Sequence, residues 1–229
     1  RHGAAQFSLA LYRSRYRCRF LFPQASDQPR QQFLRVGVSG GYIRNMNQDE
    51  GIPSWQEALG SKGLETGRPI SSAIEIAAAP EVVWKGLATP GNLKRCHPFC
   101  DSTEVESWPG VGSRDSITYY SGRSYQRNFV AWMEGMGYDI ELGESPNLTA
   151  RVLWRIAPQT ASSCRFLIEV IPYLKADLED AQKARYLERL FGDHLQHYLD
   201  CVVKGVDYWI TTGQDVKKDQ FGRNPLDSG

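Results

Sequence analysis

The chain has 229 residues, enough for one domain of ordinary size with extensions or for two small domains. Its hydrophobic fraction of 41% and aromatic fraction of 11% supply a substantial core and are not typical of a disordered chain. The 27 Lys and Arg nearly balance the 26 Asp and Glu, so no strong net charge predicts nucleic acid or an anionic membrane as a partner. No apolar run reaches the roughly 18 residues of a transmembrane helix, so we predict no integral membrane segment.

The start of the chain differs in composition from the rest. Residues 1–26 contain five Arg and no acidic residue, which resembles an organelle transit peptide. Residues 1–45 are also compatible with sequence upstream of a natural start at Met46, or with a flexible tail. We predict that residues 1–69 form an N-terminal extension that is largely irregular or flexible.

Helix and strand signals begin before residue 80. Ser54 is placed to cap a short helix over residues 53–59. Residues 70–76 alternate Ile with small or polar residues, as a half-buried strand does. A helix over residues 80–87 follows, because proline suits a first helical position and Val, Trp and Leu then share one face. Residues 90–95 indicate a second short helix.

Short strand-like runs separated by Gly and Pro turns fill the middle of the chain. Their spacing of about 8–12 residues predicts an antiparallel meander. The tightest turn is at residues 121–124, where a two-residue loop would pair Tyr120 with Tyr125 and Thr118 with Arg127. The predicted strands after the two short helices are residues 103–108, 114–120, 125–133, 138–142, 148–156 and 164–171.

A long helix is predicted near the end of the chain. Asp177 is a suitable N-cap, and apolar residues then recur at intervals of three and four as far as Gly213, which is expected to stop the helix. Such a helix spans on the order of 50 Å, enough to cross a whole sheet. Gly192 and Gly205 lie inside it and are expected to mark bending or close approach of another segment.

Several motifs within this order of elements resemble one family. Residues 74–84, IEIAAAPEVVW, look like an opening strand followed by a proline-started helix, and Pro98 follows the second helix. Residues 109–112, PGVG, look like the family's turn, and residues 152–156 and 166–170 look like its closing strand pair. Together they resemble the START and Bet v 1-like (SRPBCC) helix-grip superfamily, most closely its polyketide cyclase/dehydrase and lipid-transport group.

The resemblance implies an α+β helix-grip fold. A curved antiparallel sheet of about seven strands would wrap around the long C-terminal helix, with two short helices after the first strand and a cavity between sheet and helix. The domain would occupy residues 70–213, and residues 214–229 would be a C-terminal tail. Because this fold hosts both enzymes and carriers, the resemblance does not fix function.

Large amphipathic rings are the main candidates for the cavity wall, since they line apolar pockets and a tyrosine hydroxyl can orient a polar group. The resemblance places a charged residue near Arg127 inside the cavity, where a ligand carboxylate or carbonyl would be its partner because an unpaired buried charge is costly. The alternative is an ordinary core for the rings and a surface position for Arg127. The predicted ligand-binding residues are Tyr120, Tyr125, Arg127, Phe129, Trp154, His194, Leu195 and Tyr198.

Other chemistry is weakly indicated. His194, His197 and Cys201 can share one helix face, but no HExxH signature or external ligand accompanies them, so we predict no metal and no cofactor. The sequence contains no serine elbow and no glycine-rich phosphate loop, which disfavours triad hydrolysis and nucleotide chemistry. Five scattered cysteines do not form a disulfide framework and favour a cytoplasmic location.

Three functions are compatible with these observations. The first is binding of an apolar small molecule, lipid-like or polyketide-like. The alternative is a polyketide cyclase/dehydrase-type enzyme, which requires a proton-transfer residue with a shifted pKa in the cavity. A third, mitochondrial quinone binding, would use the Arg-rich start as a targeting signal. A buried, partnered His, Asp or Glu in the cavity would favour the enzyme, and a cavity with only Tyr and Arg would favour the carrier. The ligand, the occurrence of any reaction and the oligomeric state are left open.

Overall fold

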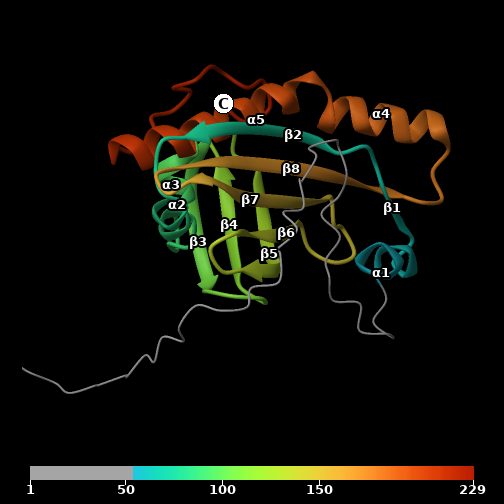
Figure 1. The fold of residues 1–229 in the computed structure, drawn as a ribbon. Coiled ribbons are helices and arrows are strands. Elements are labelled where there is room, and N and C mark those ends of the chain that lie inside the picture. The colour runs from blue at the N-terminus through green and yellow to red at the C-terminus, as the bar shows by residue number, and fades with distance from the viewer. Residues whose placement is uncertain (1–53) are drawn as a thin grey trace, which may run out of the picture. The chain divides into compact units, whose positions relative to one another are not determined.

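The structure, a computed structural model, describes residues 54–229 of the chain. The Arg-rich segment 1–45, with its interpretation as a transit peptide, lies outside the described residues. Within residues 54–229 the fold is α+β, as predicted, with a curved antiparallel sheet and a long helical segment at its C-terminal end (Figure 1). None of the helices described combines the length and the apolar composition that crossing a membrane requires.

Eight strands form the sheet, and most of them pair with their neighbours in the chain. The order across the sheet is β1-β8-β7-β6-β5-β4-β3, and β2 pairs along another part of β8. The predicted meander is therefore confirmed for β3 to β8. The last strand, β8, also pairs with the first two strands, β1 and β2. The strands are β1 Leu64–Thr66, β2 Ile70–Ile76, β3 Cys100–Ser107, β4 Arg114–Tyr119, β5 Ser124–Met133, β6 Gly137–Leu142, β7 Ala150–Thr160 and β8 Ser163–Lys175.

The segment before β2 contributes two elements to the fold. The helix α1 (Trp55–Ser61) begins at Ser54, whose hydroxyl accepts a hydrogen bond from the Glu57 backbone N–H at 3.3 Å, so the predicted cap is confirmed. Strand β1 then pairs with β8, and Leu64 packs beside Tyr173. Residues 54–66 are thus regular structure, although they fall in the segment predicted to be largely irregular.

The two short helices predicted after the first strand of the domain are present as α2 (Pro80–Leu87) and α3 (Leu93–Cys96). Side chains of α2 and α3 and the concave face of the sheet form the main core together with the C-terminal helix. This arrangement surrounds one end of the sheet with helices and leaves the space between sheet and C-terminal helix for a cavity.

The predicted single C-terminal helix is two helices, α4 (Asp180–Phe191) and α5 (Asp193–Thr212). Gly192 separates them with an extended ψ of −160°, which is consistent with the low helix propensity of glycine. The start at Asp177 is also wrong, because Glu179 is the N-cap and forms a capping box with Gln182.

The other two glycines behave as predicted. Gly213 ends α5 in the left-handed conformation, at φ 71°. Gly205 lets α5 approach α3 closely, since a Cβ atom at this position would lie 2.2 Å from the carbonyl oxygen of Cys96. Because Gly205 has no side chain, α5 can pack directly against the end of α3 at Cys96. The residue after Cys96 is His97, which is thereby held close to α5.

The β4–β5 hairpin has a different register from the one predicted. The structure pairs Ile117 with Tyr125 and Asp115 with Arg127, because the loop has three residues and closes between Tyr119 and Arg123. Gly122, at φ 82°, occupies the left-handed position that ends such a loop. A register change by an odd number of residues turns β4 over, so Asp115, Ile117 and Tyr119 share a face with Tyr125 and Arg127.

Candidate functional site

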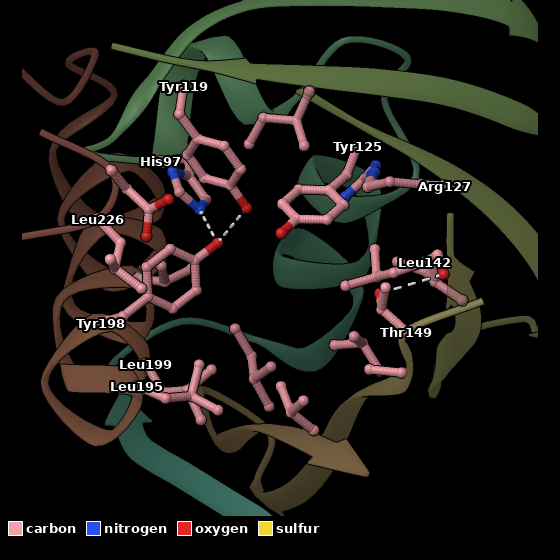
Figure 2. A pocket seen from close by; sticks show the side chains of 18 of the residues that line it. His97, Tyr119, Tyr125, Arg127, Leu142, Thr149, Leu195, Tyr198, Leu199 and Leu226 are labelled. Carbon is pink, nitrogen blue, oxygen red and sulfur yellow. Dashed lines mark hydrogen bonds between the residues drawn. The ribbon is translucent and has the colours of Figure 1, made fainter. Parts of the chain in front are cut away.

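A cavity of about 120 Å³ lies between the concave face of the sheet and α5 (Figure 2). Strands from β4 to β8 supply most of its aliphatic wall, with side chains such as Ile140 and Val152. Leu199 of α5 closes the opposite side. His97, Tyr119 and Tyr198 lie together at the end where the β4–β5 hairpin meets α5, which we call the polar end, and Arg127 and Thr149 lie across the cavity from them (Figure 2).

Most of the residues predicted to bind ligand lie in the cavity wall. Tyr120 does not, because the changed register points Tyr119 inward in its place, and the Tyr120 ring packs instead under the ammonium of Lys218. Phe129, two residues beyond Arg127 on β5, is also outside the cavity wall. It is fully buried, and the centroid of its ring lies 4.9 Å from that of Trp108. The predicted residues in the wall are Tyr125, Arg127, Trp154, His194, Leu195 and Tyr198.

Three side chains form a hydrogen-bonded group at the polar end. The Tyr198 hydroxyl lies 2.8 Å from His97 Nε2 and 2.8 Å from the Tyr119 hydroxyl (Figure 2). The backbone N–H of Phe99 donates to His97 Nδ1 at 3.2 Å. In neutral His97 the ring proton is therefore on Nε2, which donates to Tyr198.

Burial keeps this group neutral. It lowers the pKa of His97 to about 3, with a further contribution from the nearby Arg127 guanidinium. It also raises the pKa of Tyr119 and of Tyr198 well above the usual range. The group thus holds one N–H and two O–H hydrogens but only two internal hydrogen bonds. One phenolic O–H is left to donate to another acceptor.

His97 was not predicted as a site residue. The sequence shows it only between two cysteines at the end of a short helix. Nothing in that pattern connects it with Tyr198, which lies 101 residues later on α5. Tyr119 was assigned to the wrong face of β4 by the register error, so both omissions have a structural cause.

The two arginines of the cavity wall already have carboxylate partners within the chain. Arg127 makes two hydrogen bonds of 2.6 Å to Asp115, and both side chains are almost completely buried. The prediction that a ligand carboxylate or carbonyl is the partner of Arg127 is therefore wrong, because the actual register puts Asp115 directly opposite. Arg123 pairs with Asp227 at 3.2 Å. The cavity consequently presents no unpaired cation from these two residues.

His197 and Cys201 of α5 lie within hydrogen-bond distance of each other, but His194 does not complete a metal site with them. His194 lies in the cavity wall with its Nε2 atom buried and without a hydrogen-bond partner. His197 Nε2 lies 3.0 Å from the carbonyl oxygen of Arg223 and 3.6 Å from the Cys201 sulfur, and the Cys201 thiol donates to the carbonyl oxygen of Phe221. Residues 54–229 contain no group of three or more His, Cys, Asp or Glu placed to hold a metal ion.

The low pKa of His97 predicts an acid-dependent loss of stability. An unfolded chain protonates this histidine below about pH 6.5, whereas the folded protein does not until about pH 3. Between these values the unfolded state binds one more proton, so the free energy of unfolding falls by about 1.4 kcal/mol for each unit of pH lost. The expected result is that His97→Gln removes this contribution in urea titrations between about pH 7 and pH 5.

His197→Gln is the matched control, since His197 is an exposed histidine on α5. It shows what the same replacement does at an exposed position, and the slope of stability against pH in His97→Gln is compared with it. An unchanged slope in His97→Gln would contradict the assignment of His97 as a neutral, buried donor.

Comparisons with known proteins agree with this architecture. The family model described as polyketide cyclase / dehydrase and lipid transport matches residues 69–197. No curated protein sequence matches the chain.

Solved structures share the fold at low sequence identity. A Thalictrum flavum norcoclaurine synthase point mutant, bound to a transition state analogue, is 15% identical and superposes with a TM-score of 0.51 over 65% of this chain and 98% of its own. The same enzyme with dopamine and hydroxybenzaldehyde also scores 0.51, at 15% identity, over 72% of this chain and 95% of its own. A Staphylococcus aureus protein of unknown function scores 0.50, at 11% identity, over 65% and 97%. These likenesses confirm the predicted helix-grip fold.

Proposed function

This chain belongs to the polyketide cyclase/dehydrase and lipid transport family, and we propose that it binds a compact apolar molecule with a neutral hydrogen-bond acceptor at one end. The observation that carries the proposal is the spare phenolic O–H of the Tyr119–Tyr198–His97 group, placed at one end of a cavity whose lining is mostly apolar. A buried donor without an acceptor costs free energy, and a ligand carbonyl or hydroxyl would supply that acceptor.

The size of the cavity supports a small ligand. Its volume of about 120 Å³ is close to the roughly 150 Å³ of an apolar cavity that binds benzene. One aromatic ring with a short substituent fills such a space, whereas a long acyl chain does not. A ligand of this size would contact the aliphatic wall with most of its surface.

The charge distribution supports a neutral ligand. Arg127 and Arg123 are each paired with a carboxylate from the chain itself. A ligand carboxylate would have to displace Asp115 or Asp227 or remain unpaired in the cavity, and both are unfavourable. A ketone, an ester or a phenol requires only the hydrogen bond. We therefore infer that carbonyl or hydroxyl compounds bind better than acids.

A cyclase/dehydrase-type reaction on such a ligand is the second candidate, and Asp227 favours it. This carboxyl group lines the cavity, and burial raises its pKa while Arg123 opposes the rise. A carboxylate near a phenolic donor can remove a proton next to a carbonyl group that the phenol holds. His97 is a poor base for this purpose, because its pKa is about 3.

The binding proposal is tested with two molecules of the same shape, acetophenone and α-methylstyrene, which differ by C=O against C=CH₂. We expect the double variant Tyr119→Phe/Tyr198→Phe to lose about tenfold in affinity for acetophenone relative to α-methylstyrene, the size of one hydrogen bond. Both hydroxyl groups must be removed, since either can be the spare donor. Dissociation constants come from NMR titrations, whose spectra also report folding.

Tyr120→Phe is the control, because it removes a neighbouring hydroxyl group outside the cavity, and it should leave the ratio unchanged. An equal change for both molecules in the double variant would contradict the hydrogen-bonding role. In D₂O the same samples distinguish the second candidate. Protein-dependent loss of the acetophenone methyl signal, abolished in Asp227→Asn, would show catalysed proton exchange.

A further inference from the structure

The residues after α5 form part of the cavity wall. Beyond Gly213 the chain runs back beside α5, with Phe221 near Cys201, and reaches the polar end of the cavity. There Leu226 and Asp227 lie in the wall, and Figure 2 shows Leu226 beside Tyr198. The segment predicted to be a C-terminal tail is therefore in direct contact with the space where a ligand would bind.

Hydrogen bonds hold this turn, residues 224–228, in a defined shape. The Asn224 side chain accepts from the Leu226 backbone N–H at 2.9 Å and donates to the carbonyl oxygen of His194 at 2.9 Å. Ser228 accepts from the Asn224 backbone N–H at 2.7 Å and donates to Asp219 at 2.5 Å. Because Asn224 and Ser228 are buried and each is hydrogen-bonded, the position of Leu226 between them is fixed.

The turn also connects to the β4–β5 hairpin. Asp227 pairs with Arg123, and its carbonyl oxygen accepts from the Ser121 backbone N–H at 3.2 Å. The Arg123 side chain lines the cavity and is 33% exposed, so at this point the cavity wall adjoins solvent. The turn therefore lies against both the β4–β5 hairpin and α5 at the polar end of the cavity.

We propose that Leu226 sets the length of the ligand by filling the end of the cavity between the β4–β5 hairpin and α5. The inference rests on the proposed function. Most of the other aliphatic wall residues, such as Ile117 and Leu199, are almost fully buried and belong to the sheet or α5, so they also hold the fold together. Leu226 is only partly buried and lies on a turn held by its own hydrogen bonds. Its side chain can shrink without loss of the core.

The experiment compares acetophenone with hexanophenone, which carries four more methylene groups on the same carbonyl. In Leu226→Ala we expect the affinity for hexanophenone relative to acetophenone to rise about tenfold over wild type, which corresponds to two further buried methylene groups. Leu195→Ala is the matched variant, because it removes the same atoms from another part of the wall, on α5. It should change this ratio by less than about threefold.

An unchanged ratio in Leu226→Ala, or an equal rise in Leu195→Ala, would overturn the assignment. If neither ketone binds to the wild type, the proposed function fails, and a second probe still tests Leu226. The fluorescent dye N-phenyl-1-naphthylamine is uncharged and needs a longer cavity, but it requires no hydrogen bond from the tyrosines. Its fluorescence should rise several-fold with Leu226→Ala and not with Leu195→Ala, at unchanged near-UV circular dichroism. Equal fluorescence in the two variants would refute the inference.

Discussion

Arg127→Met is expected to lower the free energy of unfolding by about 3–5 kcal/mol, because it leaves the carboxylate of Asp115 buried without its partner. The two side chains are 5% and 1% exposed, and the two hydrogen bonds between them are 2.6 Å long. Methionine can replace the volume of arginine but not its charge. Urea unfolding followed by circular dichroism measures the loss.

Two further variants identify the cause. Arg114→Met is the matched control on β4, since Arg114 is exposed and its contact with Glu106 is 3.7 Å long, and it should cost less than about 1 kcal/mol. Adding Asp115→Leu to Arg127→Met removes the stranded charge and should restore much of the stability. No recovery in that double variant would mean that Arg127 acts through packing rather than through its ion pair.

The Arg127 pair also explains how far the sequence could define the site. The family resemblance placed Arg127 inside the cavity, period-two alternation put Tyr125 on the same face of β5, and both residues lie in the cavity wall. It could not choose between the faces of β4, because both were mixed in polarity. The choice depended on a loop one residue longer than assumed, with Gly122 at its last position. The one extra loop residue changes the register of β4 against β5, and this places Asp115 opposite Arg127 as its ion-pair partner.

The fold was more predictable than the site for a physical reason. Strands, short helices and their order are local properties, carried by periodicity and by residues such as Pro80 and Gly213. The contacts that make the site are long-range. His97 meets Tyr198 across 101 residues, and Arg123 meets Asp227 across 104. No local pattern encodes such contacts, so the polar end of the cavity and its C-terminal wall emerge only in three dimensions.

Trp84→Ala is expected to be the other strongly destabilising change, at about 3–5 kcal/mol, the range for removing a large aromatic side chain from a core. The predicted apolar face of α2 is confirmed, since Val83 and Leu87 are fully buried and Trp84 is 7% exposed. The ring centroids of Trp84 and Trp132 lie 5.3 Å apart. The indole N–H of Trp84 donates a hydrogen bond of 2.8 Å to the Glu134 carboxylate. Its removal therefore leaves a cavity beneath α2.

Val82→Ala is the matched control on the same helix, because Val82 is 50% exposed and should cost less than about 0.5 kcal/mol. Trp84→Phe separates ring packing from the hydrogen bond to Glu134. It should be clearly less destabilising than Trp84→Ala, since a ring still fills most of the space and Glu134 keeps its hydrogen bond from Trp132 at 3.2 Å. A loss below about 1 kcal/mol in Trp84→Ala would show that α2 does not anchor the sheet through this residue.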